Sequence, residues 1–190
     1  MTSGFYENIS LGILAGGRGL RLNGANKAFI RHENEYLSQR ILNRLDIRFA
    51  AQLISAREPD DRYIQMNLEP VFDSRPAFSG PLAGIEALLE ATKTEYLLSM
   101  PVDIKTLPLD VIAQWLNTPE RPGLVLQDSN GLQPLLALWH VVDALPVVKQ
   151  ALDRKEKAVH SVISQLNLKI IPRTDIQIGN LNTPKDFQSP

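Results

Sequence analysis

The chain has 190 residues, 44% of them apolar and 22% charged, which suits one globular domain over residues 1–190. Its 20 lysines and arginines nearly balance 21 aspartates and glutamates, so the formal net charge of -1 predicts no general attraction to nucleic acid or to an anionic membrane. The absence of cysteine excludes disulfides, thiolate metal sites and thiol catalysis. Residues 1–8 do not resemble a signal peptide, and no apolar run reaches the roughly 20 residues that span a bilayer, so we expect a cytoplasmic protein.

Short apolar segments alternate with segments of helical periodicity along the chain. In chain order we predict strand 9–15, helix 36–45, strands 51–56 and 70–72, helix 82–92, strand 95–100, helix 109–116, strands 123–127 and 135–139, helices 141–152 and 158–166, and strand 169–171. This alternation predicts an α/β fold, a Rossmann-like three-layer domain with a mainly parallel central sheet. Ligands of such sheets bind beyond the carboxyl ends of the strands, which directs attention to the loops after residues 15, 73 and 102.

The loop after the first predicted strand is rich in glycine. Four glycines occur within nine positions: Gly16, Gly17, Gly19 and Gly24. Without side chains they let backbone N–H groups approach an anion, and Arg18, Arg21 and Lys27 add three cations. The loop is not a P-loop, because Ala25 and Asn26 stand where Lys-Ser/Thr is needed, and it lacks the G-x-G-x-x-G of dinucleotide-binding folds. The alternative interpretation from composition alone is a surface turn with solvated basic side chains.

Five segments resemble one known family. Leu-Ala-Gly-Gly-x-x-x-Arg at residues 14–21, with Lys27 ten positions after the second glycine, is similar to the signature of the molybdenum cofactor guanylyltransferases, members of the wider nucleotidyltransferase superfamily. Residues 73–74 with 80–84, 100–103, 133–138 and 180–184 resemble further segments of that family in the same order. The resemblance implies transfer of GMP from GTP to the phosphate of molybdopterin, release of pyrophosphate and Mg²⁺ as the cofactor. Molybdoenzymes or cofactor-insertion proteins would be further partners.

The resemblance also implies roles for single residues in catalysis. Lys27 would contact the α-phosphate of GTP, and Arg18 and Arg21 the β- and γ-phosphates, with Arg21 counted among the catalytic residues. Asp103 would hold Mg²⁺, since a carboxylate at a strand end suits a cation that it shares with substrate phosphates. The alternatives are a solvated loop lysine at 27 and an ordinary cap of the next helix at 103.

Other positions would bind the nucleotide or support the site. Backbone groups of Leu14, Ala15 and Gly16 would meet the guanine base, with Gly16 leaving room for it and Gly17 beside it. The cytidylyltransferases tend to carry Ala-Ala-Gly here, which favours GTP. Asp73 would serve the base or the ribose, or else cap a turn, and Gly80 begins the Gly-Pro-Leu-Ala-Gly segment. Asn180 and Asn182 would donate oxygen ligands to metal or phosphate; the alternative is that Asn182, with Thr183 and Pro184, caps the last helix.

Four departures from the family pattern keep alternatives open. Asn26 stands where aspartate usually precedes the lysine, and Asn23 replaces a frequent glycine. Lys105 replaces a small residue or proline, and residues 54–57 offer only Ser55 for a family asparagine. The alternatives are a molybdopterin cytidylyltransferase, a sugar-phosphate nucleotidyltransferase and a catalytically silent nucleotide-binding module.

Overall fold

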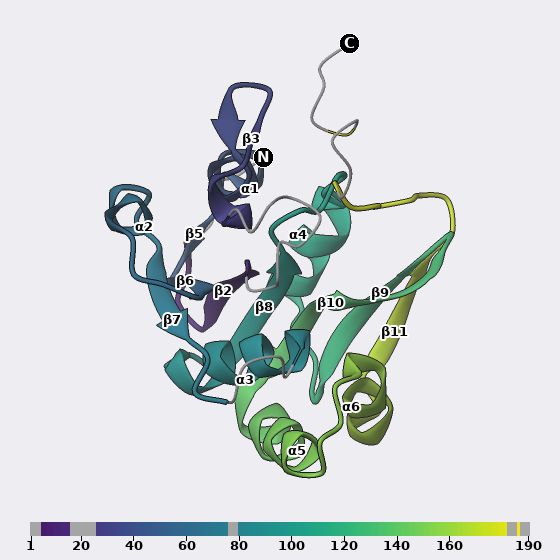
Figure 1. Cartoon of the computed structure of the whole chain (residues 1–190). Coiled ribbons are helices and arrows are strands. Elements are labelled where there is room, and N and C mark those ends of the chain that lie inside the picture. Colours follow the sequence, from purple (N-terminus) through teal and green to yellow (C-terminus); the bar gives the residue numbers. More distant parts are fainter. Residues whose placement is uncertain (1–4, 16–25, 76–79, 182–185, 187–190) are drawn as a thin grey trace.

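The computed structural model describes residues 5–15, 26–75, 80–181 and 186 (Figure 1). A seven-stranded sheet runs through its centre in the order β11-β9-β10-β8-β2-β6-β7. Its strands are β2 (Ile9–Leu14), β6 (Gln52–Ala56), β7 (Glu69–Phe72), β8 (Tyr96–Pro101), β9 (Gly123–Asp128), β10 (Gly131–His140) and β11 (Lys169–Arg173). All neighbouring strands are parallel except the two pairs that contain β10. The predicted mainly parallel α/β fold is confirmed.

Helices cover both faces of this sheet and make the three layers that the sequence predicts. The first face packs against α1 (Leu37–Leu45) and α4 (Leu109–Asn117), and the second against α3 (Pro81–Ala91), α5 (Val141–Asp153) and α6 (Val159–Leu166) (Figure 1). Strand side chains alternate between the two cores, so Leu98 and Met100 of β8 join the first core while Leu97 joins the second. Burial of both faces explains why the strands read as continuous apolar runs.

The predicted helices and strands agree with the structure to within a few residues, with one larger difference. Strand β10 begins at Gly131 rather than at residue 135, because residues 131–133 form a hairpin with β9 before a shift of register between Gln133 and Ala137. Several short elements were not predicted, since too few residues carry a periodicity: β1 (Phe5–Tyr6) paired with β5 (Arg48–Phe49), β3 (Arg31–His32) paired with β4 (Glu35–Tyr36), the 3-10 helix η2 (Lys27–Phe29) and α2 (Asp61–Gln65).

Two glycines of residues 80–84 explain how α3 lies so close to the sheet. Gly80 is the N-cap residue with φ +74°, a conformation that L side chains rarely adopt. A Cβ on Gly84 would lie 2.8 Å from Ser55 Oγ and 3.1 Å from Leu14 Cδ2, so only glycine lets the helix rest on β2 and β6. Ser55 therefore lies buried beneath α3.

In the part of the chain that the structure describes, we find no helix with both the length and the apolar character needed to cross a membrane. The cytoplasmic location stays a prediction.

Candidate functional site

The sheet has a topological switch point between β2 and β8. The chain passes from β2 to β6 and β7 on one side, and then returns to β8 on the other side of β2. The connections that follow β2 and β8 therefore lead to strands on opposite sides of this point, which is where open α/β sheets bind ligands. The two strands stay paired to their ends, since Val102 N donates to Leu14 O at 3.0 Å. Leu14 and Ala15, predicted to meet the base, are both buried at this edge.

An ion pair joins the two loops at this point. Lys27 Nζ lies 2.7 Å from Asp103 Oδ2, and the side chains are 24% and 10% exposed, respectively. Lys27 is thus not a solvated loop lysine. Asp103 is not the cap of the next helix either, because α4 begins at Leu109 with Pro108 as its N-cap residue. The structure brings together the two residues that the sequence places at the centre of the chemistry, although the sequence did not predict their direct contact.

Asn26 fixes the backbone that carries Lys27. Its Oδ1 accepts a hydrogen bond from Ala28 N at 3.1 Å and caps η2, while its Nδ2 donates to Tyr63 Oη at 2.8 Å. Tyr63 is fully buried, and burial raises the pKa of its hydroxyl. The Phe29 and Tyr63 ring centroids are 4.7 Å apart, so the aromatic pair holds the other end of the same turn. Asn26, a departure from the family pattern, therefore has a clear structural function.

A chain segment after β11 fixes the backbone that carries Asp103. Leu181 N donates to Asp103 O at 2.7 Å and Lys105 N donates to Gly179 O at 3.1 Å, so Asn180 and Ile104 form an antiparallel bridge. The bridge places Asn180, an exposed predicted site residue, beside the Asp103 loop.

Asp128 anchors this segment to the sheet. Its buried carboxylate accepts hydrogen bonds from Ile178 N at 2.9 Å, Gln133 Nε2 at 2.9 Å and Asn130 N at 2.8 Å. Burial acts to raise the pKa of Asp128, but the hydrogen bonds from Ile178, Gln133 and Asn130 outweigh it and leave the pKa below its ordinary value of 3.8. The sequence analysis missed Asp128, although an aspartate that ends an apolar strand before Ser-Asn-Gly was a visible signal.

The predicted residues Asp73 and Gly80 follow the carboxyl end of β7, apart from the Lys27–Asp103 pair. Asp73 follows β7, which is two strands and roughly 10 Å from β2. Its exposed carboxylate accepts from Arg75 N at 2.8 Å, as the turn-capping alternative predicted. Arg75 in turn forms a forked pair with buried Glu86 of α3 at 2.8 and 2.6 Å, a contact that the sequence analysis missed. Between described residues, no hydrogen bond or ion pair links Asp73 or Gly80 to Lys27 or Asp103.

Five other predicted site residues lie outside the described residues: Gly16, Gly17, Arg18, Arg21 and Asn182.

The donor chemistry at the switch point fits a magnesium ion. Asp103 presents a carboxylate, and Mg²⁺ is commonly held by one or two carboxylates together with substrate phosphates and water. Among the described residues, no group of three or more histidine, aspartate or glutamate side chains is arranged to hold a metal ion.

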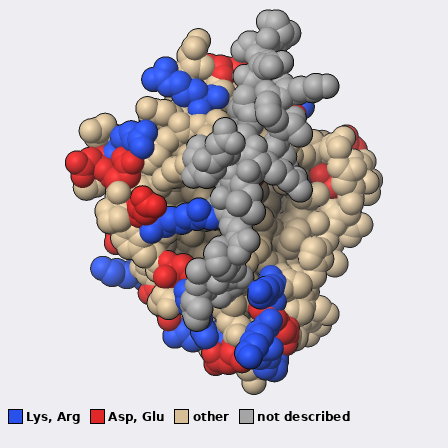
Figure 2. Space-filling view, in the orientation of Figure 1, with Lys and Arg blue, Asp and Glu red and all other residues tan. Residues whose placement is uncertain are grey.

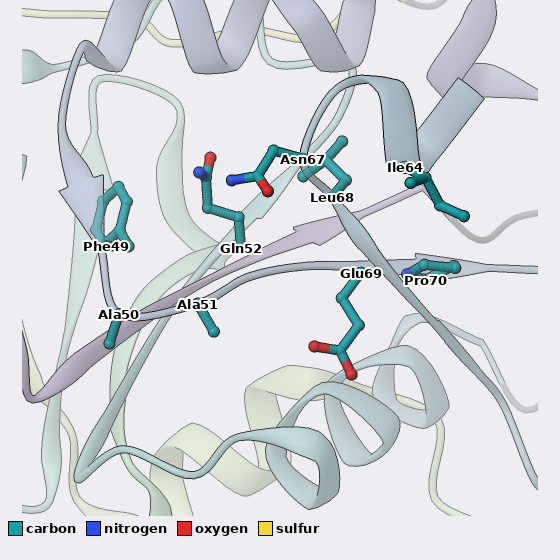
Figure 3. Close-up of a pocket in the computed structure, with 9 residues that line it drawn as sticks. All are labelled: Phe49, Ala50, Ala51, Gln52, Ile64, Asn67, Leu68, Glu69 and Pro70. Atoms are coloured by element: carbon teal, nitrogen blue, oxygen red, sulfur yellow. The ribbon is translucent and has the colours of Figure 1, made fainter. Parts of the chain in front are cut away.

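A separate hollow lies at the other end of the strands, on the side of their amino termini. It is lined by residues 49–52, 64 and 67–70, which include the first residues of β6 and β7 (Figure 3). Because β6 and β7 run parallel to β2, this hollow lies at their amino ends, away from the loop that carries Lys27. It is therefore not part of the switch-point site.

The surface charges are mixed in sign. Figure 2 shows the face of the molecule that is turned to the viewer in Figure 1. Over its described residues, Lys and Arg side chains are interspersed with Asp and Glu side chains. This mixture of signs agrees with the formal net charge of -1.

Comparisons with known proteins agree with this fold. The model of the MobA-like NTP transferase domain family matches residues 11–169. The molybdenum cofactor guanylyltransferase of Serratia proteamaculans is 33% identical over 184 residues, which cover 95% of this chain and 93% of that protein. Its counterpart in Polynucleobacter asymbioticus is 32% identical over 192 residues, with coverages of 96% and 95%.

Solved structures share the fold at lower identity. Molybdopterin-guanine dinucleotide biosynthesis protein A from Archaeoglobus fulgidus superposes with a TM-score of 0.71 at 19% identity and covers 94% of both chains. The 4-diphosphocytidyl-2C-methyl-D-erythritol synthase of Anaerococcus prevotii gives a TM-score of 0.70 at 13% identity, again with 94% of both chains covered. The fold is thus shared by proteins whose names refer to guanine and to cytidine nucleotides.

Proposed function

The chain belongs to the MobA-like NTP transferase family, and from that premise we propose that it transfers GMP from GTP to the phosphate of molybdopterin. The relatives of about 30% identity that are named molybdenum cofactor guanylyltransferase support this choice of substrates. The observation that carries the proposal is the Lys27–Asp103 pair, since it puts a cation and an oxygen ligand side by side at the edge where nucleotides bind.

The proposed reaction forms one bond to the α-phosphorus of GTP and breaks another. A terminal phosphate oxygen of molybdopterin attacks the α-phosphorus of GTP, a new P–O bond forms, and the bond to the β-phosphate oxygen breaks so that pyrophosphate leaves with the electron pair. Negative charge increases on the leaving group and on the non-bridging oxygens of the α-phosphate. Catalysis is therefore mainly positioning and electrostatic stabilisation. We propose that Lys27, the cation of the pair with Asp103, supplies part of this stabilisation.

The ion pair gives each residue a partner before the nucleotide arrives. With GTP bound, the ammonium of Lys27 would exchange the carboxylate for an α-phosphate oxygen, and Asp103 would then hold Mg²⁺. Bound Mg²⁺ would neutralise phosphate charge and orient the triphosphate. Because neither charge stays unpaired in either state, the exchange avoids the cost of a partly buried lone ion.

The choice of guanine rests on the loop that follows β2. Backbone groups of Leu14 and Ala15 lie at its start, and Gly16 is proposed to leave space for the purine. The names of the relatives point to guanine as well.

Pyrophosphate release by the purified protein tests the proposal. We expect release that requires GTP, Mg²⁺ and molybdopterin together, with little release when CTP replaces GTP. Preference for CTP would indicate a cytidylyltransferase, and release with a sugar phosphate in place of molybdopterin would indicate a sugar-nucleotide enzyme. Nucleotide binding without release of pyrophosphate in the presence of any of these acceptors would indicate a silent binding module and would contradict the proposal.

A further inference from the structure

Arg40 of α1 is a buried cation whose recorded hydrogen bonds go to backbone carbonyls. It is 2% exposed, its Nη1 donates to Ile104 O at 2.7 Å and its Nη2 donates to Lys105 O at 2.5 Å. Among the described residues its buried Nε has no hydrogen-bond partner. Burial lowers the pKa of the guanidinium, as expected for a charge removed from water. Burying a charge in this way costs free energy and is an inefficient means of stabilising a fold. We therefore infer that the position of the two carbonyls bound by Arg40 is important.

These carbonyls follow Asp103 directly. On one side of this loop, the amide of Lys105 and the carbonyl of Asp103 bond to the segment 179–181. In such an antiparallel bridge the carbonyl of Ile104 faces the other way, where it meets Arg40. The Asp103 loop is therefore held between α1 and the segment 179–181, with backbone bonds on one side and a guanidinium fork on the other.

The same helix also holds the loop that carries Lys27. Ser38, two residues before Arg40, is fully buried, and its Oγ donates to Ala28 O at 2.8 Å. Ala28 follows Lys27 just as Ile104 follows Asp103. Side chains of helix α1 thus bind the backbone carbonyls of Ala28 and Ile104, the residues that follow the two members of the ion pair.

We propose that Ser38 and Arg40 act as a bracket that sets the separation of Lys27 and Asp103. They are positioning residues, since neither is placed to touch the nucleotide, and their catalytic effect rests on the proposed function. The physical basis is that a helix moves as one rigid body. Two loops that are hydrogen-bonded to the same helix are therefore held at a fixed separation more firmly than their own backbone contacts would hold them. Nucleotide binding requires the ion pair to exchange partners without the loops moving apart, and the bracket meets that requirement.

The test compares Arg40→Met, Arg40→Lys and Ser38→Ala with Arg44→Met as the matched control. Arg44 lies on the same helix, but it is exposed and its recorded ion pair is a long contact of 3.5 Å with Glu33. The first measurement is amide hydrogen exchange of the protein without nucleotide or metal, read at Lys105 and Leu181 and normalised to amides of β2. We expect exchange in Arg40→Met to rise by about tenfold or more at these two amides, because a hydrogen bond from a charged donor is worth at least that factor in a local opening equilibrium.

The second measurement is turnover as a function of GTP and Mg²⁺. Arg40→Met should lower kcat by about ten- to a hundredfold, as for a modest misplacement of catalytic groups. The KM for GTP should change much less, and Arg40→Lys, which keeps the charge but loses the fork, should recover part of the loss. Ser38→Ala should lower kcat in the same direction by a smaller factor, and Arg44→Met should match the wild type in both measurements.

Two results would overturn the bracket. One is faster exchange spread evenly over the sheet, in proportion to a lower free energy of unfolding, which is the signature of a merely structural role. The other is an unchanged exchange rate at Lys105 and Leu181 in Arg40→Met. If Arg40→Met does not fold, Arg40→Lys decides by the same comparison. A wild type without transferase activity would refute the proposed function alone, because the exchange measurement needs neither GTP nor metal.

Discussion

Lys27 Nζ and Asp103 Oδ2 lie 2.7 Å apart, although 76 positions separate the two residues in the chain. Each stands in a loop that follows one of the two strands flanking the switch point of the sheet. Their opposite charges cancel before any ligand arrives. Because the charges of Lys27 and Asp103 offset each other in this pair, the variants of these two residues should have opposite effects on nucleotide affinity.

Removal of the Lys27 side chain should affect turnover more than GTP affinity. We expect Lys27→Ala to lower kcat by on the order of a hundredfold, the usual scale for one preorganised charge that acts in the transition state. Lys105→Ala is the matched control, because it removes an exposed lysine from the Asp103 loop and leaves the backbone bond to Gly179 in place. Steady-state kinetics with GTP measure both, and near-normal turnover of Lys27→Ala would remove Lys27 from the mechanism.

Removal of the Asp103 charge should separate metal-dependent from metal-free binding. Asp103→Asn keeps the shape but loses the anion, so magnesium-dependent turnover should fall steeply and Mn²⁺ should restore part of it. Without metal the variant should bind GTP more tightly than the wild type, because Lys27 no longer has a carboxylate partner. Calorimetric titration of GTP with and without Mg²⁺ measures this sign reversal. Full magnesium-dependent activity in Asp103→Asn would place the metal on other residues.

A methyl group at position 84 should destabilise the fold. Gly84→Ala would gain up to about 1 kcal/mol of helix propensity, but the clash with Ser55 Oγ and Leu14 Cδ2 should cost about 1–3 kcal/mol and prevail. Urea unfolding measures the difference. The double variant Gly84→Ala/Ser55→Ala should recover part of the loss, since it removes the nearer contact at 2.8 Å. Stabilisation by Gly84→Ala alone would mean that α3 can shift away from the sheet at little cost.

The Asp128 anchor should make stability sensitive to acid. The folded pKa of Asp128 lies below its ordinary value of 3.8, so the unfolded chain binds the proton more readily. Its contribution is therefore complete above about pH 4 and is lost as the pH falls further toward the folded pKa. Asp128→Asn should lower stability by about 1–3 kcal/mol at neutral pH, because one carboxylate oxygen that accepts hydrogen bonds is replaced by a donor. It should also reduce the acid dependence measured by urea unfolding from pH 6 to pH 3. Glu7→Gln, on an exposed turn, is the control and should change stability at neutral pH by less than about 0.5 kcal/mol.

The Asn26 cap should tolerate aspartate but not alanine. Asn26→Asp keeps the acceptor for Ala28 N, and its other oxygen accepts a hydrogen bond from the Tyr63 hydroxyl, so we expect stability within about 0.5 kcal/mol of the wild type. Asn26→Ala loses both bonds and should cost about 1–2 kcal/mol. Chemical unfolding measures stability, and kcat shows whether a looser η2 misplaces Lys27. An equal loss in both variants would show that the residue acts by another route than its two hydrogen bonds.

The sequence predicts the layers of the fold well for a physical reason. Strands buried on both faces must be apolar throughout, and the helices between them need one apolar face, so both leave clear periodicities. Short elements such as η2 and α2 leave none. Their stability comes from single contacts, such as that of Asn26 with Tyr63, whose partners are 37 positions apart.

The candidate site is predictable in part for the same reason. Lys27 and Asp103 are found by resemblance, and the switch-point rule places their loops at one edge of the sheet. Arg40 is not predictable, because helical periodicity treats a charged residue as solvent-facing and its partners are backbone carbonyls, which have no sequence signature. Asp128 could have been suspected from its position at a strand end, but its partners could not, since two of its three recorded hydrogen-bond donors are backbone amides.

The bridge between Ile104 and Asn180 has a consequence for the order of events during synthesis. The strands around the switch point are complete once residue 101 has been made, but the backbone partners of the Asp103 loop are residues 178–181. A ribosome-bound chain that stops before these residues lacks the backbone hydrogen-bond partners of the Asp103 loop. If the chain acts as the proposed transferase, a catalytically competent Asp103 loop therefore requires residues 178–181 to have been made, and the strands around the switch point alone do not suffice.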